Sequence, residues 1–317
     1  MVLAADAPIV GTGRDYTHLV QDYRVHGSLY TDPAVFADEM KRIFTDGWVF
    51  VGHESEIPGG GDWVARRLGT ERVLMARAHD GEISVVANRC AHRGTTLCPQ
   101  SEGNSRNFRC PYHAWTYDLD GMLLGAPFPQ RFANEKPDVR LDQPGQVGIY
   151  RGFVFANQSG TAGPLSEHLG SGGSDLIDRA ADMSPTGRLQ LRDVAIEAEG
   201  AEKAKQIMWD GPPHAFVFPN LFLGEMNIAR IDPLAPGLTE HYHTPLLVES
   251  SDLGINRRVI LQSEAVMGPG GARSPSSSST RRCSQTSRGT RSGLTWSPTT
   301  FTTGCRSGPV TTSRTPG

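Results

Sequence analysis

The sequence predicts an α+β protein with an all-β domain at its centre. Two patterns along the 317-residue chain support this prediction. Between residues 31 and 47, apolar side chains recur every three or four positions, as they do on one face of a helix. From residue 48 to residue 157, short apolar stretches alternate with glycine-rich turns, which is typical of β-strands joined by tight connections.

The N-terminal segment, residues 1–46, is expected to contain one packing helix. Asp32 can cap the helix and Pro33 suits its first turn, and Gly47 is expected to end it. The apolar stripe of this helix consists of Phe36, Met40, Ile43 and Phe44.

The all-β domain is expected over residues 47–160. Its strands are predicted at residues 48–52, 72–77, 82–87, 117–122 and 152–156. Asp80-Gly81 lies between the second and third of these stretches and indicates a hairpin. The domain has about the size of an ordinary folding unit.

Two short motifs in this domain carry metal-ligand chemistry. The first is Cys90-Ala91-His92, and the second runs from Cys110 to His113, with seventeen residues between the two motifs. A Rieske [2Fe–2S] cluster needs two thiolates on one iron and two imidazoles on the other, whereas zinc can use the same four side chains in one tetrahedral site. The flanking His-Arg-Gly and Cys-Pro-Tyr-His-Ala-Trp sequences favour the cluster, so Cys90, His92, Cys110 and His113 are the predicted ligands.

Residues near these motifs have simpler expected roles. Cys98 is expected to be a small buried thiol, and Trp115 is expected to pack beneath the second motif. His53 is expected at the surface end of a strand, with a contact near the cluster as the alternative. Residues 125–127 are either a surface turn or a cover for the cluster.

Composition and charge restrict the class of protein. No stretch of eighteen apolar residues and no signal-peptide pattern are present, so a cytoplasmic protein that is not inserted in a membrane is expected. Five cysteines do not form a disulfide scaffold in a chain of this length, which suits a reducing compartment. The net charge is −3, although residues 271–317 contain seven arginines and no acidic residue. A basic arm for nucleic acid is the alternative explanation of that segment, but it lacks interleaved aromatic residues, so no nucleic-acid partner is expected.

The chain resembles a known family over residues 30–170. Residues 47–58, 88–94 and 108–115, together with 164–170, look like the large (α) subunits of Rieske non-haem iron ring-hydroxylating oxygenases. A second patch, residues 211–221, resembles the middle of the catalytic domain of that family. The resemblance implies an incomplete helix-grip α+β catalytic domain over residues 161–270.

The resemblance also implies an activity and partners. An NAD(P)H-dependent reductase or a ferredoxin would supply electrons to the cluster, and a mononuclear Fe(II) would use O2 to hydroxylate a small aromatic or related ring compound. The second iron would be held by two histidines and a carboxylate. Members of the family assemble as homotrimers or as αβ oligomers.

The sequence departs from the family where the second iron should be bound. None of His168, His214, His241 and His243 stands in the expected motif, so no iron ligand and no catalytic residue is assigned. His241 and His243 are expected on one face of a strand, most simply as ordinary sheet residues.

The C-terminal segment departs further. After Met267-Gly268-Pro269-Gly270, an Asp-rich stretch should follow, but 22 of the 47 residues from 271 to 317 are Ser or Thr. We expect this segment to be a disordered tail and hypothesise that it is a frameshifted translation. An electron-transfer protein or a truncated, non-catalytic product is therefore the alternative to an active oxygenase.

Overall fold

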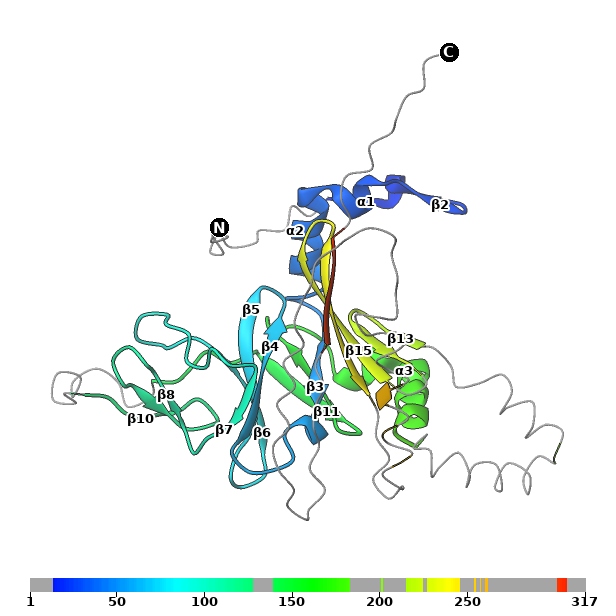
Figure 1. Cartoon of the computed structure of the whole chain (residues 1–317). Helices are drawn as coiled ribbons and strands as arrows, with labels where there is room; N and C mark the ends of the chain where they lie inside the picture. The colour runs from blue at the N-terminus through cyan, green and yellow to red at the C-terminus, as the bar shows by residue number, and fades with distance from the viewer. Residues whose placement is uncertain are drawn as a thin grey trace.

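The computed structural model of the chain describes residues 14–127, 139–182, 215–224, 227–245 and 301–306, with the single positions 201, 254, 257, 260 and 261. Figure 1 shows three regions in these residues: an N-terminal helical arm, a group of β-sheets that contains β3 to β12, and a second sheet that begins at β13. The α+β class predicted from the sequence is confirmed. No helix in the described part of the chain is long and apolar enough to cross a bilayer.

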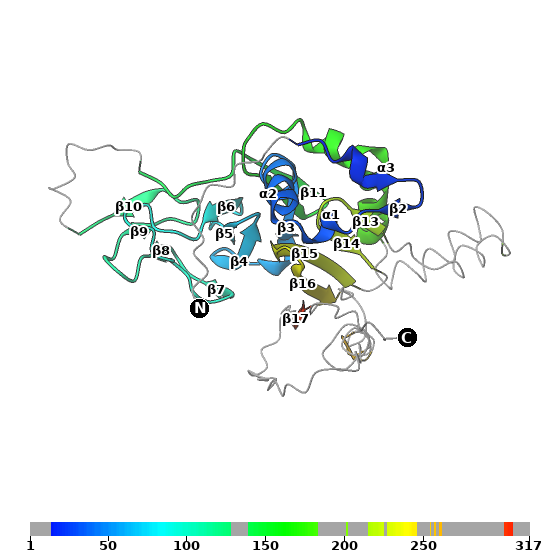
Figure 2. The ribbon, with the colours of Figure 1, turned by 90° about the horizontal axis from the view of Figure 1, so that it is seen from above.

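The N-terminal arm contains short elements followed by one regular helix. They are η1 (Thr17–Leu19), β1 (Val20–Gln21), β2 (Arg24–Val25), α1 (Ser28–Thr31) and α2 (Pro33–Arg42). Asp32 caps α2 as predicted, because its side chain accepts a hydrogen bond of 2.8 Å from the backbone N–H of Ala34. In the view from above, α2 lies over β3 (Figure 2).

The prediction that α2 continues to Gly47 is wrong, because the helix ends at Arg42. Beyond it the chain makes wider turns, in which the N–H of Phe44 donates to Glu39 and the N–H of Asp46 donates to Lys41, five residues back in each case. The hydroxyl of Thr45 also donates a hydrogen bond of 2.9 Å to the carbonyl of Met40. A β-branched residue that bonds back to the previous turn favours such an ending.

Two sheets form the middle of the molecule. One has the order β6-β5-β4-β7 and contains β4 (Asp62–Leu68), β5 (Glu71–Arg77), β6 (Ile83–Ala87) and β7 (Glu102–Asn104). The other has the order β11-β12-β3 and contains β3 (Val49–His53), β11 (Gln146–Tyr150) and β12 (Phe153–Asn157). The predicted hairpin joins β5 to β6, where Gly81 adopts a positive φ of 97°. Valines of both sheets and Met75 of β5 pack between the two sheets as one core.

A smaller sheet at one end of the molecule carries the cysteine- and histidine-containing motifs. Its order is β10-β9-β8, with β8 (Phe108–Arg109), β9 (Thr116–Tyr117) and β10 (Leu123–Gly125). A short helix, η2 (Glu54–Glu56), follows β3 in the chain.

The second large sheet has the order β13-β14-β15-β16-β17. Its strands are β13 (Ala215–Val217), β14 (Leu221–Leu223), β15 (Asn227–Ala235), β16 (Leu238–Pro245) and β17 (Phe301–Arg306). The helix α3 (Leu165–Asp182), which is broken at Gly170, packs against it. This sheet and α3 share a core with β3 and β12, to which Trp48 and Phe155 contribute.

The tail contains one described element that the sequence did not predict. Residues 271–317 were expected to be disordered, but Phe301–Arg306 pairs with β16 in antiparallel register. For these six residues the prediction is wrong. Phe, Thr and Cys suit a pleated strand, and backbone pairing along the edge of β16 does not require the hydrophobic periodicity that the tail lacks. The rest of the tail lies outside the described residues.

Candidate functional site

The first ligand motif follows β6 and closes as a tight loop. Cys90 donates its backbone N–H to the carbonyl of Thr95 at 2.8 Å, and its own carbonyl accepts from the N–H of Gly94 at 2.9 Å. Gly94 has a φ of 73°, a conformation that glycine adopts without strain. Asn88, which is buried at the start of the loop, accepts from the backbone N–H groups of Leu97 and Cys98.

The second ligand motif follows β8 and repeats the same hydrogen bonds. Cys110 donates its N–H to the carbonyl of Trp115 at 2.8 Å, and its carbonyl accepts from Ala114 at 3.0 Å. Ala114 takes the place of Gly94 with a φ of 57°, which is costly for a residue with a side chain. Two loops of the same construction therefore face each other, and each carries one cysteine and one histidine.

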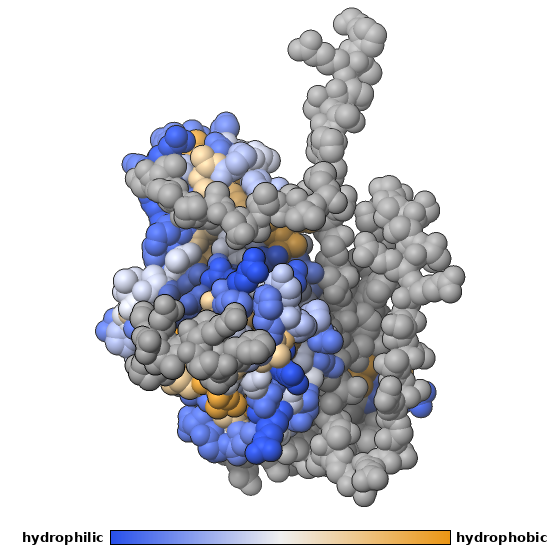
Figure 3. All heavy atoms as spheres, turned by 90° about the vertical axis from the view of Figure 1, so that its left-hand side faces the viewer, coloured by the Kyte–Doolittle hydropathy of each residue, from blue (hydrophilic) through white to orange (hydrophobic). Residues whose placement is uncertain are grey.

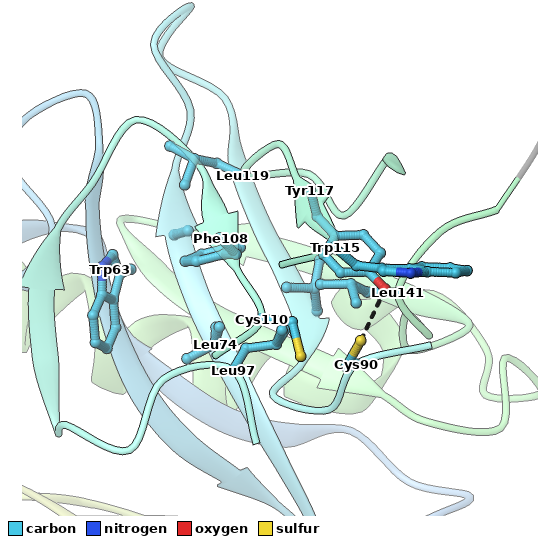
Figure 4. Close-up of a cluster of buried hydrophobic side chains, with 12 residues drawn as sticks. Trp63, Leu74, Cys90, Leu97, Phe108, Cys110, Trp115, Tyr117, Leu119 and Leu141 are labelled. Carbon is cyan, nitrogen blue, oxygen red and sulfur yellow. Dashed lines mark hydrogen bonds between the residues drawn. The ribbon is translucent and has the colours of Figure 1, made fainter. Parts of the chain in front are cut away.

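The four predicted ligands are arranged by type. Cys90 and Cys110 are each 3% exposed and belong to one hydrophobic core, which Figure 4 shows with their two sulfur atoms near each other. His92 is exposed and His113 is half-buried, and their ring centroids are 4.9 Å apart. Thiols on the inside and imidazoles on the outside suit a two-iron cluster with a buried end and an exposed end.

Tyr117 touches one of the thiols. Its hydroxyl lies 3.2 Å from the sulfur of Cys90, and its side chain is fully buried in β9 (Figure 4). Burial raises the pKa of Tyr117 well above the ordinary tyrosine value, so this hydroxyl keeps its proton. A thiolate sulfur can only accept, so the tyrosine would be the donor whenever Cys90 is ionised.

Trp115 supports a histidine of the other loop. Its indole is stacked on the His92 imidazole, with ring centroids 4.7 Å apart and an interplanar angle of 5°. Trp115 itself is buried, so the predicted packing role holds, and it fixes the plane of an exposed ring. The pKa of His92 is lowered by slight desolvation of the ring and then by the neighbouring His113 and Arg93.

The outer surface of the two loops is exposed. Tyr112 is 59% exposed and its ring lies 3.7 Å from that of His113, while the Arg93 guanidinium lies 5.8 Å from the Tyr112 ring. Figure 3 shows the end of the molecule to which these loops belong, where hydrophilic residues surround small hydrophobic patches. The histidine side of the site is therefore accessible from outside the molecule in the described part of the chain.

Other residues near the site partly follow expectation. Cys98 is half-buried, and burial raises the pKa of its thiol to about 11, so it stays a neutral packing group. Ala126 packs against the core that contains both cysteines, whereas Gly125 and Pro127 are exposed, so the covering role of residues 125–127 stays a prediction. His53 caps η2 by accepting a hydrogen bond from the backbone N–H of Ser55, and its side chain also contacts Phe153 and the carbonyl of Arg151.

The described histidines of the second region make ordinary contacts. His168 bonds through Nε2 to the carbonyl of Phe218 at 3.0 Å, and burial lowers its pKa. His241 and His243 lie on one face of β16 as expected, with ring centroids 6.2 Å apart. His214 lies outside the described residues. Within the described part of the chain, no three His, Cys, Asp or Glu side chains are grouped closely enough to hold a single metal ion.

Sequence reasoning missed several residues that the fold brings to important positions. The sequence indicates Tyr117 only as part of a strand, although it lies seven residues after Cys110. Asn220 and Arg230 contact β3 from far along the chain. No local pattern signals these contacts, since the partners are separated by up to 179 residues.

Known proteins match both the sequence and the fold. The family model of the Rieske [2Fe-2S] domain matches residues 47–141. The α subunit of the N,N-dimethyl phenylurea N-demethylase of a Sphingobium strain is 41% identical over 162 residues, which cover 50% of this chain and 35% of that protein. The α subunit of the chlorobenzene dioxygenase of a Cupriavidus strain is 31% identical over 257 residues, which cover 78% of this chain and 56% of that protein.

The solved structure of naphthalene 1,2-dioxygenase with bound indole has a similar fold. The TM-score is 0.66 with 19% identity, over 77% of this chain and 75% of that one. The chain spans about half the length, or less, of the curated relatives it matches. Residues 47–141 are therefore a Rieske [2Fe–2S] domain, in a chain that is related to the large subunits of Rieske oxygenases.

Proposed function

We propose that this chain is a Rieske oxygenase α subunit that accepts electrons from a reductase or ferredoxin for O2-dependent hydroxylation of an aromatic or related ring compound. Cys90, His92, Cys110 and His113 would hold the [2Fe–2S] cluster. The observation that carries the proposal is the sorting of these four side chains into two buried thiols and two outward-facing imidazoles. The α subunits of an N,N-dimethyl phenylurea N-demethylase and of a chlorobenzene dioxygenase are similar to 50% and 78% of this chain, respectively.

The residues around the site fit a cluster. The bound cluster would take up one electron at a time and release it to an acceptor. The backbone loops fix both cysteines through repeated hydrogen bonds, and Tyr117 can donate to one sulfur. Trp115 holds His92 in plane, and the exposed edge of His92 leaves room for an electron donor. Leu97 belongs to the cysteine-containing core and Ala126 packs against it, so both would shield the buried end of the cluster from water.

A second candidate is an electron-transfer protein or a truncated, non-catalytic product. It is favoured by the absence of the second iron-binding motif from the sequence and by the ordinary contacts of His168, His241 and His243 in the structure. Both candidates share the cluster, and they differ in whether a mononuclear Fe(II) is bound and O2 is used. We further propose a cytoplasmic location and assembly with other copies or with β subunits, as in the family.

Metal analysis of anaerobically purified protein separates the candidates. Iron and acid-labile sulfide are counted per chain, and visible and EPR spectra are recorded before and after addition of nitric oxide. Two irons and two sulfides indicate the cluster alone. A third iron that gives a nitrosyl EPR signal indicates the oxygenase site. Absence of any Rieske spectrum would overturn both candidates.

A further inference from the structure

The free edge of β3 lies inside the molecule. In the described sheet β11-β12-β3, β3 pairs with β12 on one side only. Even so, Val49, Phe50 and Val51 are each at most 3% exposed. Backbone N–H and C=O groups on a buried edge need partners, because an orphaned buried group costs as much as a lost hydrogen bond.

Asn220 supplies the partners of Phe50. The N–H of Phe50 donates to Oδ1 of Asn220 at 2.9 Å, and Nδ2 of Asn220 donates to the carbonyl of Phe50 at 3.0 Å. Asn220 is fully buried in the turn between β13 and β14. The side-chain amide of Asn220 therefore supplies the acceptor and the donor that a residue of a neighbouring strand would supply to β3.

Arg230 supplies the partner of Val51. The register between β3 and β12 shifts at this point, so that Val51 has no residue opposite it. In such a β-bulge the extra residue is left out of the backbone hydrogen bonds between the two strands. Nη1 of Arg230, from β15, donates to the carbonyl of Val51 at 3.0 Å.

The positive charge of Arg230 is paired with a neighbouring carboxylate. Its Nε and Nη2 bond to the carboxylate of Asp232 at 3.1–3.2 Å, and both residues are about 95% buried. The guanidinium also lies 4.3 Å from the ring of Tyr242 on β16. A guanidinium held on three sides in this way is a fixed donor, since removing either charge leaves the other buried and unpaired.

We propose that Asn220 and Arg230 complete the edge of β3, and that the Rieske domain and the β13–β16 sheet consequently unfold as one cooperative unit. The shared core supports this, because Phe50 and Phe155 pack together with Leu221 and Ile228. The Rieske domain would then not be an autonomous unit to which residues 215–245 are merely attached. The proposal concerns the backbone of β3 and is independent of whether the chain is an oxygenase.

Hydrogen exchange on the unaltered full-length chain gives the first test. Amides of β3, β5 and β14–β15 are followed by mass spectrometry in rising concentrations of denaturant. One cooperative unit predicts that all three sets merge into the same exchange event with the same denaturant dependence. Exchange of β14–β15 through an opening that leaves β3 protected would overturn the proposal.

A side-chain variant gives the second test. Asn220→Leu keeps similar volume but removes both bonds to Phe50, and exchange of β3 amides is expected to rise at least about tenfold. Asn104→Leu is the matched control, because Asn104 also makes two side-chain hydrogen bonds, to Gly60 and Asp62, but within the Rieske domain itself. Because Asn104 is exposed, the loss of its hydrogen bonds costs little free energy of unfolding, so the control should raise the exchange of β3 far less than Asn220→Leu does.

A charge-balanced variant covers Arg230. Arg230→Met combined with Asp232→Leu removes both charges, so no unpaired charge remains. Faster exchange at β3 in this double variant supports the proposal, and unchanged exchange at β3 in both this variant and Asn220→Leu contradicts it. If a variant does not fold, the exchange of the unaltered chain decides.

Discussion

Replacing Tyr117 with phenylalanine should lower the reduction potential of the cluster. The substitution removes one hydroxyl, which lies 3.2 Å from the sulfur of Cys90, and leaves the buried ring in place. Reduction adds negative charge to the cluster, so a hydrogen bond to its sulfur ligand is stronger in the reduced state. Loss of the hydroxyl therefore destabilises the reduced state more than the oxidised one.

The size of the shift follows from the strength of that bond. A hydrogen bond to a charged acceptor contributes about 1.5–3 kcal/mol, of which only the difference between the two redox states matters. If that difference is about 1 kcal/mol, and about 59 mV corresponds to a tenfold change for one electron, the potential falls by ~40 mV.

Protein-film voltammetry or an EPR-monitored redox titration measures this shift. Tyr242→Phe is the matched control, because Tyr242 also uses its hydroxyl, to Glu240 at 2.6 Å, but on the second sheet. The control should keep the potential of the unaltered protein. An unchanged or raised potential in Tyr117→Phe would refute the assignment of this hydroxyl as a donor to the cluster.

Three further predictions concern the loops and their surroundings. Cys110→Ser and His113→Ala should each abolish the visible cluster spectrum, and zinc should not restore a folded site; a retained spectrum would exclude these ligands. Ala114→Gly should stabilise the protein by up to about 1 kcal/mol in denaturant unfolding, since φ is 57°, whereas Gly94→Ala at 73° should destabilise it; the reverse order would be inconsistent with the loop geometry. Burial lowers the pKa of His53, so the unfolded chain binds the extra proton and stability falls as pH drops below about 6.5. His53→Gln should flatten that fall between about pH 7.5 and about pH 5.5 in urea unfolding, and an equally steep profile would contradict the role of this histidine.

The four proposed ligand residues could be named from the sequence because the chemistry that suggests them is local. Two short motifs contain both the donor atoms and the flanking residues that distinguish a cluster from zinc. Most of the strands around them were also predictable, since alternation and glycine-rich turns are properties of neighbouring residues. The predicted strand at residues 117–122 is wrong, because residues 118–121 form a turn that joins β9 to β10. The structure then adds what spacing does not contain: the shared hydrogen-bond pattern of both loops and the stacking of Trp115 on His92.

Contacts between distant segments were not predictable. Tyr117 reaches Cys90 only because β9 lies over the first loop, and Asn220 reaches Phe50 across 170 residues. The early end of α2 was not predictable either. The Thr45 hydroxyl donates a hydrogen bond to the carbonyl of Met40 and so competes with the backbone hydrogen bonds of the helix, which an apolar stripe does not reveal. Pairing of β17 with β16 depends on a free strand edge and not on the composition of the tail.

Pulsed EPR of the reduced protein tests the central claim most directly. If His92 and His113 bind one iron of the cluster, electron–nuclear double resonance should detect two coupled histidine nitrogens. His113→Cys should leave one nitrogen coupling if a cluster still forms, whereas the control His53→Gln should leave both. A cluster without nitrogen coupling in the unaltered protein, or the loss of a coupling in His53→Gln alone, would contradict the proposed ligand set.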